Sequence, residues 1–155
     1  MAFNGYLVRN VGAQLYADLR GSNFQPPTDV LIFTLNQENG TRNQNRERRT
    51  NIPPHQWRLI PVDAGANLYT IQSVLTGQFA ATSSVTSGAK VQSGLTSQAW
   101  QVIVTDTFSR NYIIKAPNTN LVWSVPSGSG SETVITLDNQ TSNNTYQQWT
   151  LTTIV

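Results

Sequence analysis

A tryptophan that follows a glutamine by two residues opens a run of apolar and β-branched residues at two places in the chain. These are Trp100 in "SQAWQVIVTD" and Trp149 in "TYQQWTLTTIV". A third such run begins at Trp57 in "PHQWRLIPVD", where His55 takes the place of the glutamine. A motif that recurs in this way predicts a chain built from three repeats.

The segments that would open the three repeats support this prediction. The stretches "GYLVRNVGAQLYADL", "LYTIQSVLTGQFAAT" and "NYIIKAPNTNLVWSV" align without a gap and bring Tyr6, Tyr69 and Tyr112 into one column. Each contains two β-type stretches around a short turn, and two more follow before the repeat ends. We expect repeats over approximately 1–65, 66–108 and 109–155. In the first repeat we expect strands near 5–11, 14–20, 29–36 and 57–62.

The spacing of apolar residues favours an all-β fold. They alternate, or cluster in short β-branched runs bounded by Gly, Pro, Asn and Ser, and helical periodicity is almost absent. One four-stranded unit cannot bury its apolar face alone, so three units must close around a shared axis. The 155 residues suffice for one such domain. The sequence therefore predicts a single β-trefoil domain with pseudo-threefold symmetry.

Composition excludes several classes of function. A net charge of +2 is too small to indicate a nucleic-acid partner, and no run is long enough to span a membrane. There is no cysteine and one histidine, which argues against disulfides, a metal site or a cofactor. No acidic pair has a spacing typical of general acid–base catalysis, so we expect no enzymatic activity. Since "MAFNGYLVRN" lacks the features of a signal peptide, we expect a cytoplasmic protein.

The three Q-x-W-like motifs in register resemble those of the ricin-B (R-type) lectin family of β-trefoils. The resemblance covers nearly the whole chain. Because the chain has no cysteine, it is most similar to the intracellular mushroom members of the family. In that family the tryptophan lies in the core and the glutamine braces a loop. We therefore expect Trp57, Trp100 and Trp149 to be buried and equivalent, and His55 to be structural. Trp123 shares its column with two alanines and should behave differently.

The resemblance also implies where a sugar would bind. Family sites use an aspartate at the end of the second strand and an aromatic ring on the third. A carboxylate accepts charge-assisted hydrogen bonds from two hydroxyls, and a ring stacks on the C–H face of a galactose-type sugar. The carboxylate column here contains Asp18, Ala81 and Ser124, and the ring column contains Phe33, Gly94 and Leu137. Only the first repeat has both groups, which predicts one site for galactose or N-acetylgalactosamine. The alternative is that Asp18 caps a turn and Phe33 is a core or barrel-mouth residue.

Further residues around this site follow from the same resemblance. Asn36 comes just after the third strand, and Arg20 and Gly21 lie on the turn that would form one lip of the pocket. The family places a polar residue directly before its Q-x-W motif, where this chain has Pro54. We expect Asn51, or another asparagine of the preceding insertion, to supply that group. A chain with one site needs a homodimer to cross-link glycans.

The insertion over residues 37–54 leaves three interpretations open. Its segment "NGTRNQNRERRTNIPP" contains Arg42, Arg46, Arg48 and Arg49 against a single acidic residue, Glu47. It is either a solvated flexible loop, a wall of an extended glycan or anion site, or a reactive loop for a trypsin-like protease. Mushroom β-trefoils include protease inhibitors, so a protease is the alternative partner to a glycan, with Arg46, Arg48 and Arg49 as inhibitory residues.

Overall fold

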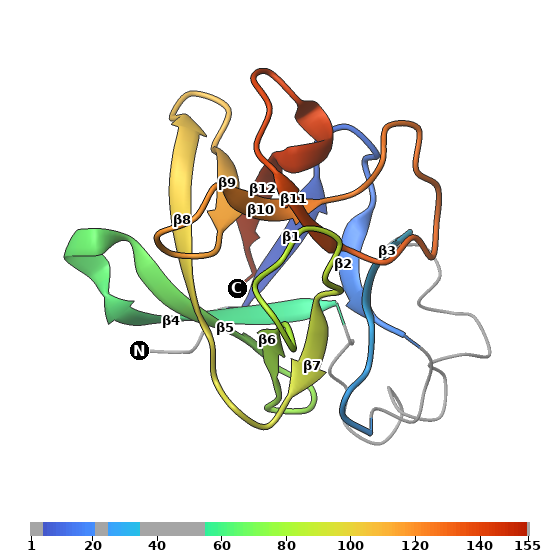
Figure 1. Cartoon of the computed structure of the whole chain (residues 1–155), viewed down its shortest axis with the longest axis vertical. Coiled ribbons are helices and arrows are strands. Elements are labelled where there is room, and N and C mark those ends of the chain that lie inside the picture. The colour runs from blue at the N-terminus through green and yellow to red at the C-terminus, as the bar shows by residue number, and fades with distance from the viewer. Residues whose placement is uncertain (1–4, 21–24, 35–54, 155) are drawn as a thin grey trace.

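The computed structural model describes residues 5–20, 25–34 and 55–154, which form twelve strands (Figure 1). The first repeat contributes β1 (Tyr6–Asn10), β2 (Tyr16–Leu19), β3 (Val30–Phe33) and β4 (Gln56–Asp63). The second contributes β5 (Leu68–Ser73), β6 (Phe79–Ala81), β7 (Gln92–Gly94) and β8 (Ala99–Asp106). The third contributes β9 (Asn111–Lys115), β10 (Leu121–Ser124), β11 (Thr136–Asn139) and β12 (Trp149–Thr153). Two 3₁₀ turns, η2 (Ala64–Ala66) and η3 (Thr145–Gln147), lie between described strands. The four strands expected in the first repeat are all present.

Six of the strands close into a barrel. Antiparallel pairing runs from β1 to β4, β5, β8, β9 and β12, and β12 pairs with β1 again. A closed ring has no free strand edge, so its backbone donors and acceptors are satisfied within the fold. The hairpins β2–β3, β6–β7 and β10–β11 attach to this barrel through β1, β5 and β9.

These three hairpins meet one another at one end of the barrel and form a cap. Each hairpin joins the next through one isolated β-bridge. The bridged residues lie in the second strand of each hairpin or in the segment just before it. The bridges are Asp29 with Gln92, Lys90 with Thr136, and Leu31 with Val134. They follow the same threefold pattern as the barrel strands, so the predicted β-trefoil with pseudo-threefold symmetry is confirmed.

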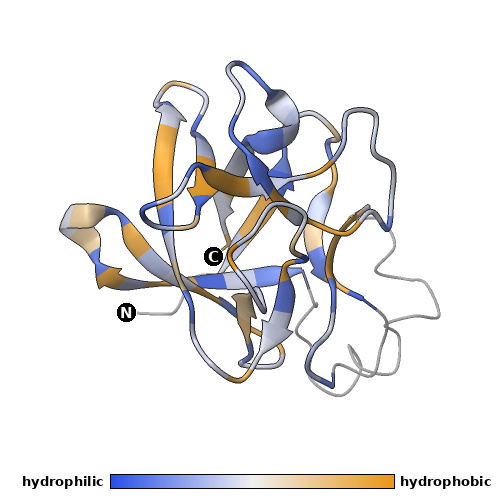
Figure 2. Ribbon diagram, viewed as in Figure 1, coloured by the Kyte–Doolittle hydropathy of each residue, from blue (hydrophilic) through white to orange (hydrophobic). Residues whose placement is uncertain are grey.

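The core follows the same symmetry. One column of the barrel consists of Val8, Ile71 and Ile114, each about 1% exposed. Figure 2 shows that hydrophobic residues are concentrated on the strands, whereas the connections are mostly polar. The β-branched runs in the sequence therefore mark the strands that bury apolar surface.

The tryptophans of the Q-x-W-like motifs are buried and equivalent, as predicted. None is more than 1% exposed, and each indole donates a hydrogen bond to the carbonyl of the second strand in its own repeat. The bonds run from Trp57 to Ala17 (2.9 Å), from Trp100 to Ala80 (2.9 Å) and from Trp149 to Trp123 (3.2 Å). These tryptophans thus hold the second strand of each repeat to the start of the fourth.

Trp123 differs from the other three, as expected. It is 0% exposed, and its ring meets Trp100 edge to face at 5.5 Å and Trp149 at 6.1 Å. Its indole nitrogen has no hydrogen-bond partner in the described part of the chain. Trp123 stands where the other repeats have an alanine, so it fills the core rather than fixing a strand.

Candidate functional site

The predicted pair, Asp18 and Phe33, lies on one face of the β2–β3 hairpin. The register places Asp18 opposite Leu31, and Phe33 opposite Tyr16. Residues two apart on a strand point to the same side, so Asp18 and Phe33 are diagonal neighbours, a distance that an aromatic side chain can span. The alternate residues of both strands, including Ala17, belong to the hydrophobic core cluster on the other face.

The two side chains differ in exposure. Asp18 is 3% exposed, and its Oδ1 accepts a hydrogen bond from the Leu19 backbone nitrogen at 2.7 Å. It also has at least one further interaction partner. Phe33 is half-buried at the end of β3. The carboxylate is thus held in one orientation by the local backbone, and the ring keeps part of its surface open.

The equivalent positions in the other repeats follow from their registers. In the second repeat, Gly94 lies opposite Phe79, so its predicted equivalence to Phe33 is confirmed. In the third, Leu137 lies opposite Trp123 and is a 0% exposed core residue. The prediction that Leu137 occupies the ring position is therefore wrong.

The residue equivalent to Phe33 in the third repeat is Asp138, which lies opposite Val122 and is exposed. The error arose because the β10–β11 connection is one residue longer than the β6–β7 connection. A shift of one residue moves a side chain to the other face of the hairpin. The first repeat remains the one in which a carboxylate and an aromatic ring share this face.

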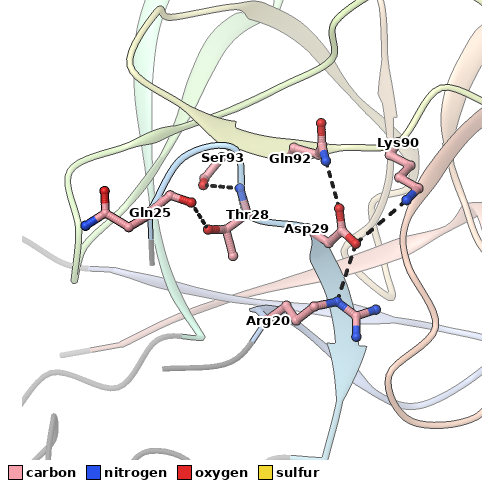
Figure 3. Close-up of polar contacts among 7 residues, drawn as sticks. All are labelled: Arg20, Gln25, Thr28, Asp29, Lys90, Gln92 and Ser93. Carbon is pink, nitrogen blue, oxygen red and sulfur yellow. Dashed lines mark hydrogen bonds and ion pairs between the residues drawn. The ribbon is translucent and has the colours of Figure 1, made fainter. Parts of the chain in front are cut away.

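Arg20, expected on the lip of the pocket, is engaged in an ion pair at the boundary with the second repeat. Its Nε lies 3.4 Å from Oδ2 of Asp29, and Nζ of Lys90 lies 4.0 Å from the same oxygen (Figure 3). Gln92 donates from Nε2 to the other oxygen, Oδ1, at 2.8 Å. Asp29 is therefore the centre of a polar cluster that joins two repeats, a role that the sequence did not suggest.

A second contact at this boundary positions the start of β3. The Thr28 backbone nitrogen donates to the Ser93 hydroxyl at 3.1 Å, and the Thr28 hydroxyl donates to the Gln25 carbonyl at 2.7 Å (Figure 3). Together with the Asp29 cluster, these bonds fix the strand that carries Phe33 against the second repeat.

Several predicted residues lie outside the described part of the chain. They are Gly21, Asn36 and Asn51 of the expected sugar site, and Arg46, Arg48 and Arg49 of the alternative inhibitory loop. The whole insertion over 37–54 lies outside it as well. Of the expected site, the structure describes Asp18, Arg20 and Phe33.

The glutamines of the second and third motifs brace loops, as the resemblance implied. Oε1 of Gln147 accepts from the Thr141 backbone nitrogen at 2.8 Å, and its Nε2 donates to the Asn139 carbonyl at 2.8 Å. Gln98 accepts from the Thr82 backbone nitrogen at 2.8 Å. The two glutamines hold different segments, because Thr82 follows β6 whereas Thr141 follows β11.

His55 takes the place of this glutamine in the first repeat. It is 6% exposed, and burial lowers the pKa of its imidazole to about 4. The side chain is therefore neutral at neutral pH. Its position in the scaffold motif and its burial agree with the expected structural role.

The low pKa of His55 predicts a loss of stability in mild acid. The imidazole of His55 binds a proton less readily in the folded state than in the unfolded chain. Its effect on the free energy of unfolding is therefore absent above pH 6.5, and the free energy of unfolding falls as the pH drops from 6.5 towards 4. We expect a loss of about 2 kcal/mol between pH 7 and pH 5. Urea unfolding at several pH values measures it, and His55→Gln, which restores the glutamine of the other repeats, should remove most of it. An unchanged pH profile in that variant contradicts the assignment.

Two further features bear on the class of protein. Among the described residues, no three His, Asp or Glu side chains gather in a group that could hold a metal ion. No helix in these residues is long and apolar enough to cross a membrane.

Comparison with solved structures gives likenesses over nearly the whole chain. The ricin B-like lectin of Macrolepiota procera, solved in complex with lactose, has a TM-score of 0.73 at 16% identity and covers 95% of this chain and 93% of its own. The Rhizoctonia solani agglutinin has a TM-score of 0.75 at 19% identity, covering 97% and 95%. A proteinase inhibitor from Coprinopsis cinerea has a TM-score of 0.71 at 12% identity, covering 99% and 100%.

Sequence comparisons give no such likeness. No protein-family model and no curated protein matches the chain. The structural likenesses, all at low identity, establish the architecture. The chain has the β-trefoil fold, which it shares with these lectins and with the proteinase inhibitor.

Proposed function

We propose that the protein is a non-enzymatic lectin with one working carbohydrate site, on the β2–β3 hairpin of the first repeat. The observation that carries this proposal is the contrast among the three equivalent hairpins. The first combines Asp18 with the ring of Phe33 on one face, whereas the second has Ala81 with Gly94 at these positions. Alanine and glycine can neither accept a hydrogen bond from a sugar hydroxyl nor stack on a sugar ring.

The third hairpin supports the same proposal. It has Ser124 and Asp138 at the two positions, so it offers polar groups without an aromatic platform. Stacking on a ring buries the apolar face of a sugar without requiring further hydrogen bonds. A site that lacks the ring loses this contribution, and we infer that the third repeat does not bind sugar.

In the first hairpin the carboxylate is held in one orientation and is almost fully buried. The carboxylate of Asp18 is fixed by the Leu19 backbone, so it loses little freedom when it accepts hydrogen bonds from a ligand. Because Asp18 is 3% exposed, a sugar that reaches it must replace some of its present neighbours. Phe33, at the end of β3, offers the stacking surface.

A galactose-type sugar is the proposed ligand. The lectin of Macrolepiota procera was solved with lactose, which carries a terminal galactose, and this supports galactose or N-acetylgalactosamine here. One site of this kind should bind a monosaccharide in the millimolar range, about −4 kcal/mol. Agglutination of cells by such a chain requires at least a homodimer. The same proposal includes a single domain built from the repeats 1–65, 66–108 and 109–155.

A glycan array tests the proposal. The full chain, labelled with a fluorophore, should give signals for glycans that end in galactose or N-acetylgalactosamine. Signals confined to glycans without these sugars would contradict the proposed specificity. An array with no signal would contradict the proposal that the protein is a lectin.

The likeness to the Coprinopsis cinerea proteinase inhibitor favours a second candidate, an inhibitor of trypsin-like or other proteases. In this chain the basic residues for such a role are Arg46, Arg48 and Arg49, which lie outside the described residues. A good inhibitory loop is rigid before it binds, so that little entropy is lost. The insertion has no disulfide to hold it, since the chain has no cysteine.

Titration with trypsin distinguishes the two candidates. For a lectin, we expect trypsin to cut within 37–54 and to keep its full activity, because the arginines of the insertion are then ordinary substrates. For an inhibitor, trypsin should lose activity stoichiometrically, and Arg→Ala changes at positions 46, 48 and 49 should restore it. Residual trypsin activity and mass spectrometry of the chain measure both results.

A further inference from the structure

A cavity of about 700 Å³ lies at the end of the barrel away from the cap. Among the described residues, its lining comes from the barrel strands and the turns that join them, and none comes from the β2–β3, β6–β7 or β10–β11 hairpins. This barrel-mouth cavity is therefore separate from the proposed carbohydrate site. Its volume falls in the range of about 300–1,000 Å³ that is usual for small-molecule sites.

The walls of the cavity repeat with the threefold symmetry of the barrel. Tyr6, Tyr69 and Tyr112, the residues that align in the sequence, line it and are all half-buried. Deeper in the barrel, the equivalent residues Leu59, Val102 and Leu151 also line it. The cavity thus offers an apolar floor surrounded by aromatic rings.

Several polar groups that line the cavity make no hydrogen bond or ion pair with described residues, so they can bind a ligand. Within the described residues, none of the three tyrosine hydroxyls makes a hydrogen bond. Arg110 also lines the cavity, at the turn between β8 and β9, where it is exposed with a φ of 56°. Its guanidinium forms no ion pair with any described residue.

The carboxylate of Asp106, in the same turn as Arg110, accepts hydrogen bonds from other residues of the turn. Asp106 accepts hydrogen bonds from the Ser109 hydroxyl at 2.7 Å and from the Phe108 backbone nitrogen at 3.0 Å. These bonds organise the turn that presents Arg110. Phe108 itself is 97% exposed, so an additional apolar side chain is available on this turn.

We propose that the barrel-mouth cavity binds a small amphipathic anion, with an aromatic or aliphatic body and one carboxylate or sulfonate group. The body would contact the leucine and valine floor and the tyrosine rings, while the anionic group would pair with Arg110. Contact with the cavity wall would remove the apolar body of the ligand from water. Arg110 at the rim provides the positive charge that would pair with the anionic group.

The test uses two fluorescent probes with the full chain: anilinonaphthalene sulfonate, which is an anion, and phenylnaphthylamine, which is neutral. Both should bind saturably with one site per chain. Arg110→Gln should weaken the anionic probe about five- to tenfold and the neutral probe less than twofold. Lys90→Gln, which changes a cation in the cap, should change neither. If Arg110→Gln and Lys90→Gln change the affinity for the anionic probe equally, or if neither probe binds saturably, the proposal is overturned.

A second pair of variants tests the location. Val104 lines the cavity and is 42% exposed, so Val104→Trp can cover the mouth without disturbing the core. It should reduce the affinity for both probes at least tenfold. Val62→Trp is the matched control, since Val62 is 57% exposed and does not line the cavity. If Val104→Trp leaves binding unchanged, or if the two variants act alike, the probes bind elsewhere and the proposal fails.

Discussion

Replacement of Trp100 by alanine is expected to lower the free energy of unfolding by about 3–5 kcal/mol. The indole is 0% exposed, and its nitrogen donates to the Ala80 carbonyl at 2.9 Å. Alanine removes the buried ring, leaves a cavity beside Trp123 and deprives the Ala80 carbonyl of its partner. Since natural domains are stable by about 5–15 kcal/mol, this loss is a large part of the total. Urea unfolding followed by far-UV circular dichroism measures it.

The matched control is Leu95→Ala, which removes a large apolar side chain from the loop just before the same motif. Leu95 is 78% exposed, so this change should alter the stability by less than about 0.5 kcal/mol. Trp57→Ala and Trp149→Ala should resemble Trp100→Ala, because all three indoles make equivalent hydrogen bonds. A cost for Trp100→Ala as small as that of Leu95→Ala would contradict this description of the core.

Substitution of Asp18 is expected to have the largest effect on function. Asp18→Ala should abolish glycan binding, because it removes the charged acceptor of the proposed site. Asp18→Asn keeps the shape and an oxygen that can accept from Leu19, but loses the charge. Charge-assisted hydrogen bonds are roughly twice as strong as neutral ones, so we expect at least a tenfold loss of affinity in Asp18→Asn. Titration with lactose, followed by calorimetry or by chemical shifts, measures both variants.

Two controls separate this effect from a general loss of structure. Asp138→Ala removes the carboxylate that stands at the ring position of the third repeat, and Ser124→Ala removes the hydroxyl equivalent to Asp18. Neither should change the affinity for the sugar. If binding survives Asp18→Ala, the site lies elsewhere and Asp18 is a buried turn-capping residue.

The sequence predicted the fold because its repeats are visible in two columns. The tyrosine lies on the first strand of each repeat and the tryptophan on the fourth, and the structure shows the tryptophans in equivalent hydrogen bonds. Strand identity followed from β-branched runs, which depend on local pattern. The ends of the strands depend on turn geometry and were less well predicted.

The errors and omissions concern contacts between segments that are far apart in the sequence. Leu137 was assigned to the ring position because the third repeat was given the same spacing as the second, and one extra residue between β10 and β11 places Leu137 in the core. The Asp29 cluster was missed because Lys90 and Gln92 approach it only when the hairpins meet. The tyrosine column was visible in the sequence, but the cavity it surrounds exists only after the barrel closes.

The most direct test of the proposed function is a titration of the isotopically labelled full chain with lactose, followed by amide chemical shifts. We predict that the shifts change with one site per chain, in the millimolar range, and that the largest changes belong to Asp18, Leu19 and Phe33. Shift changes centred on the other two hairpins or on the barrel-mouth cavity, or no change at tens of millimolar lactose, would contradict a single carbohydrate site in the first repeat.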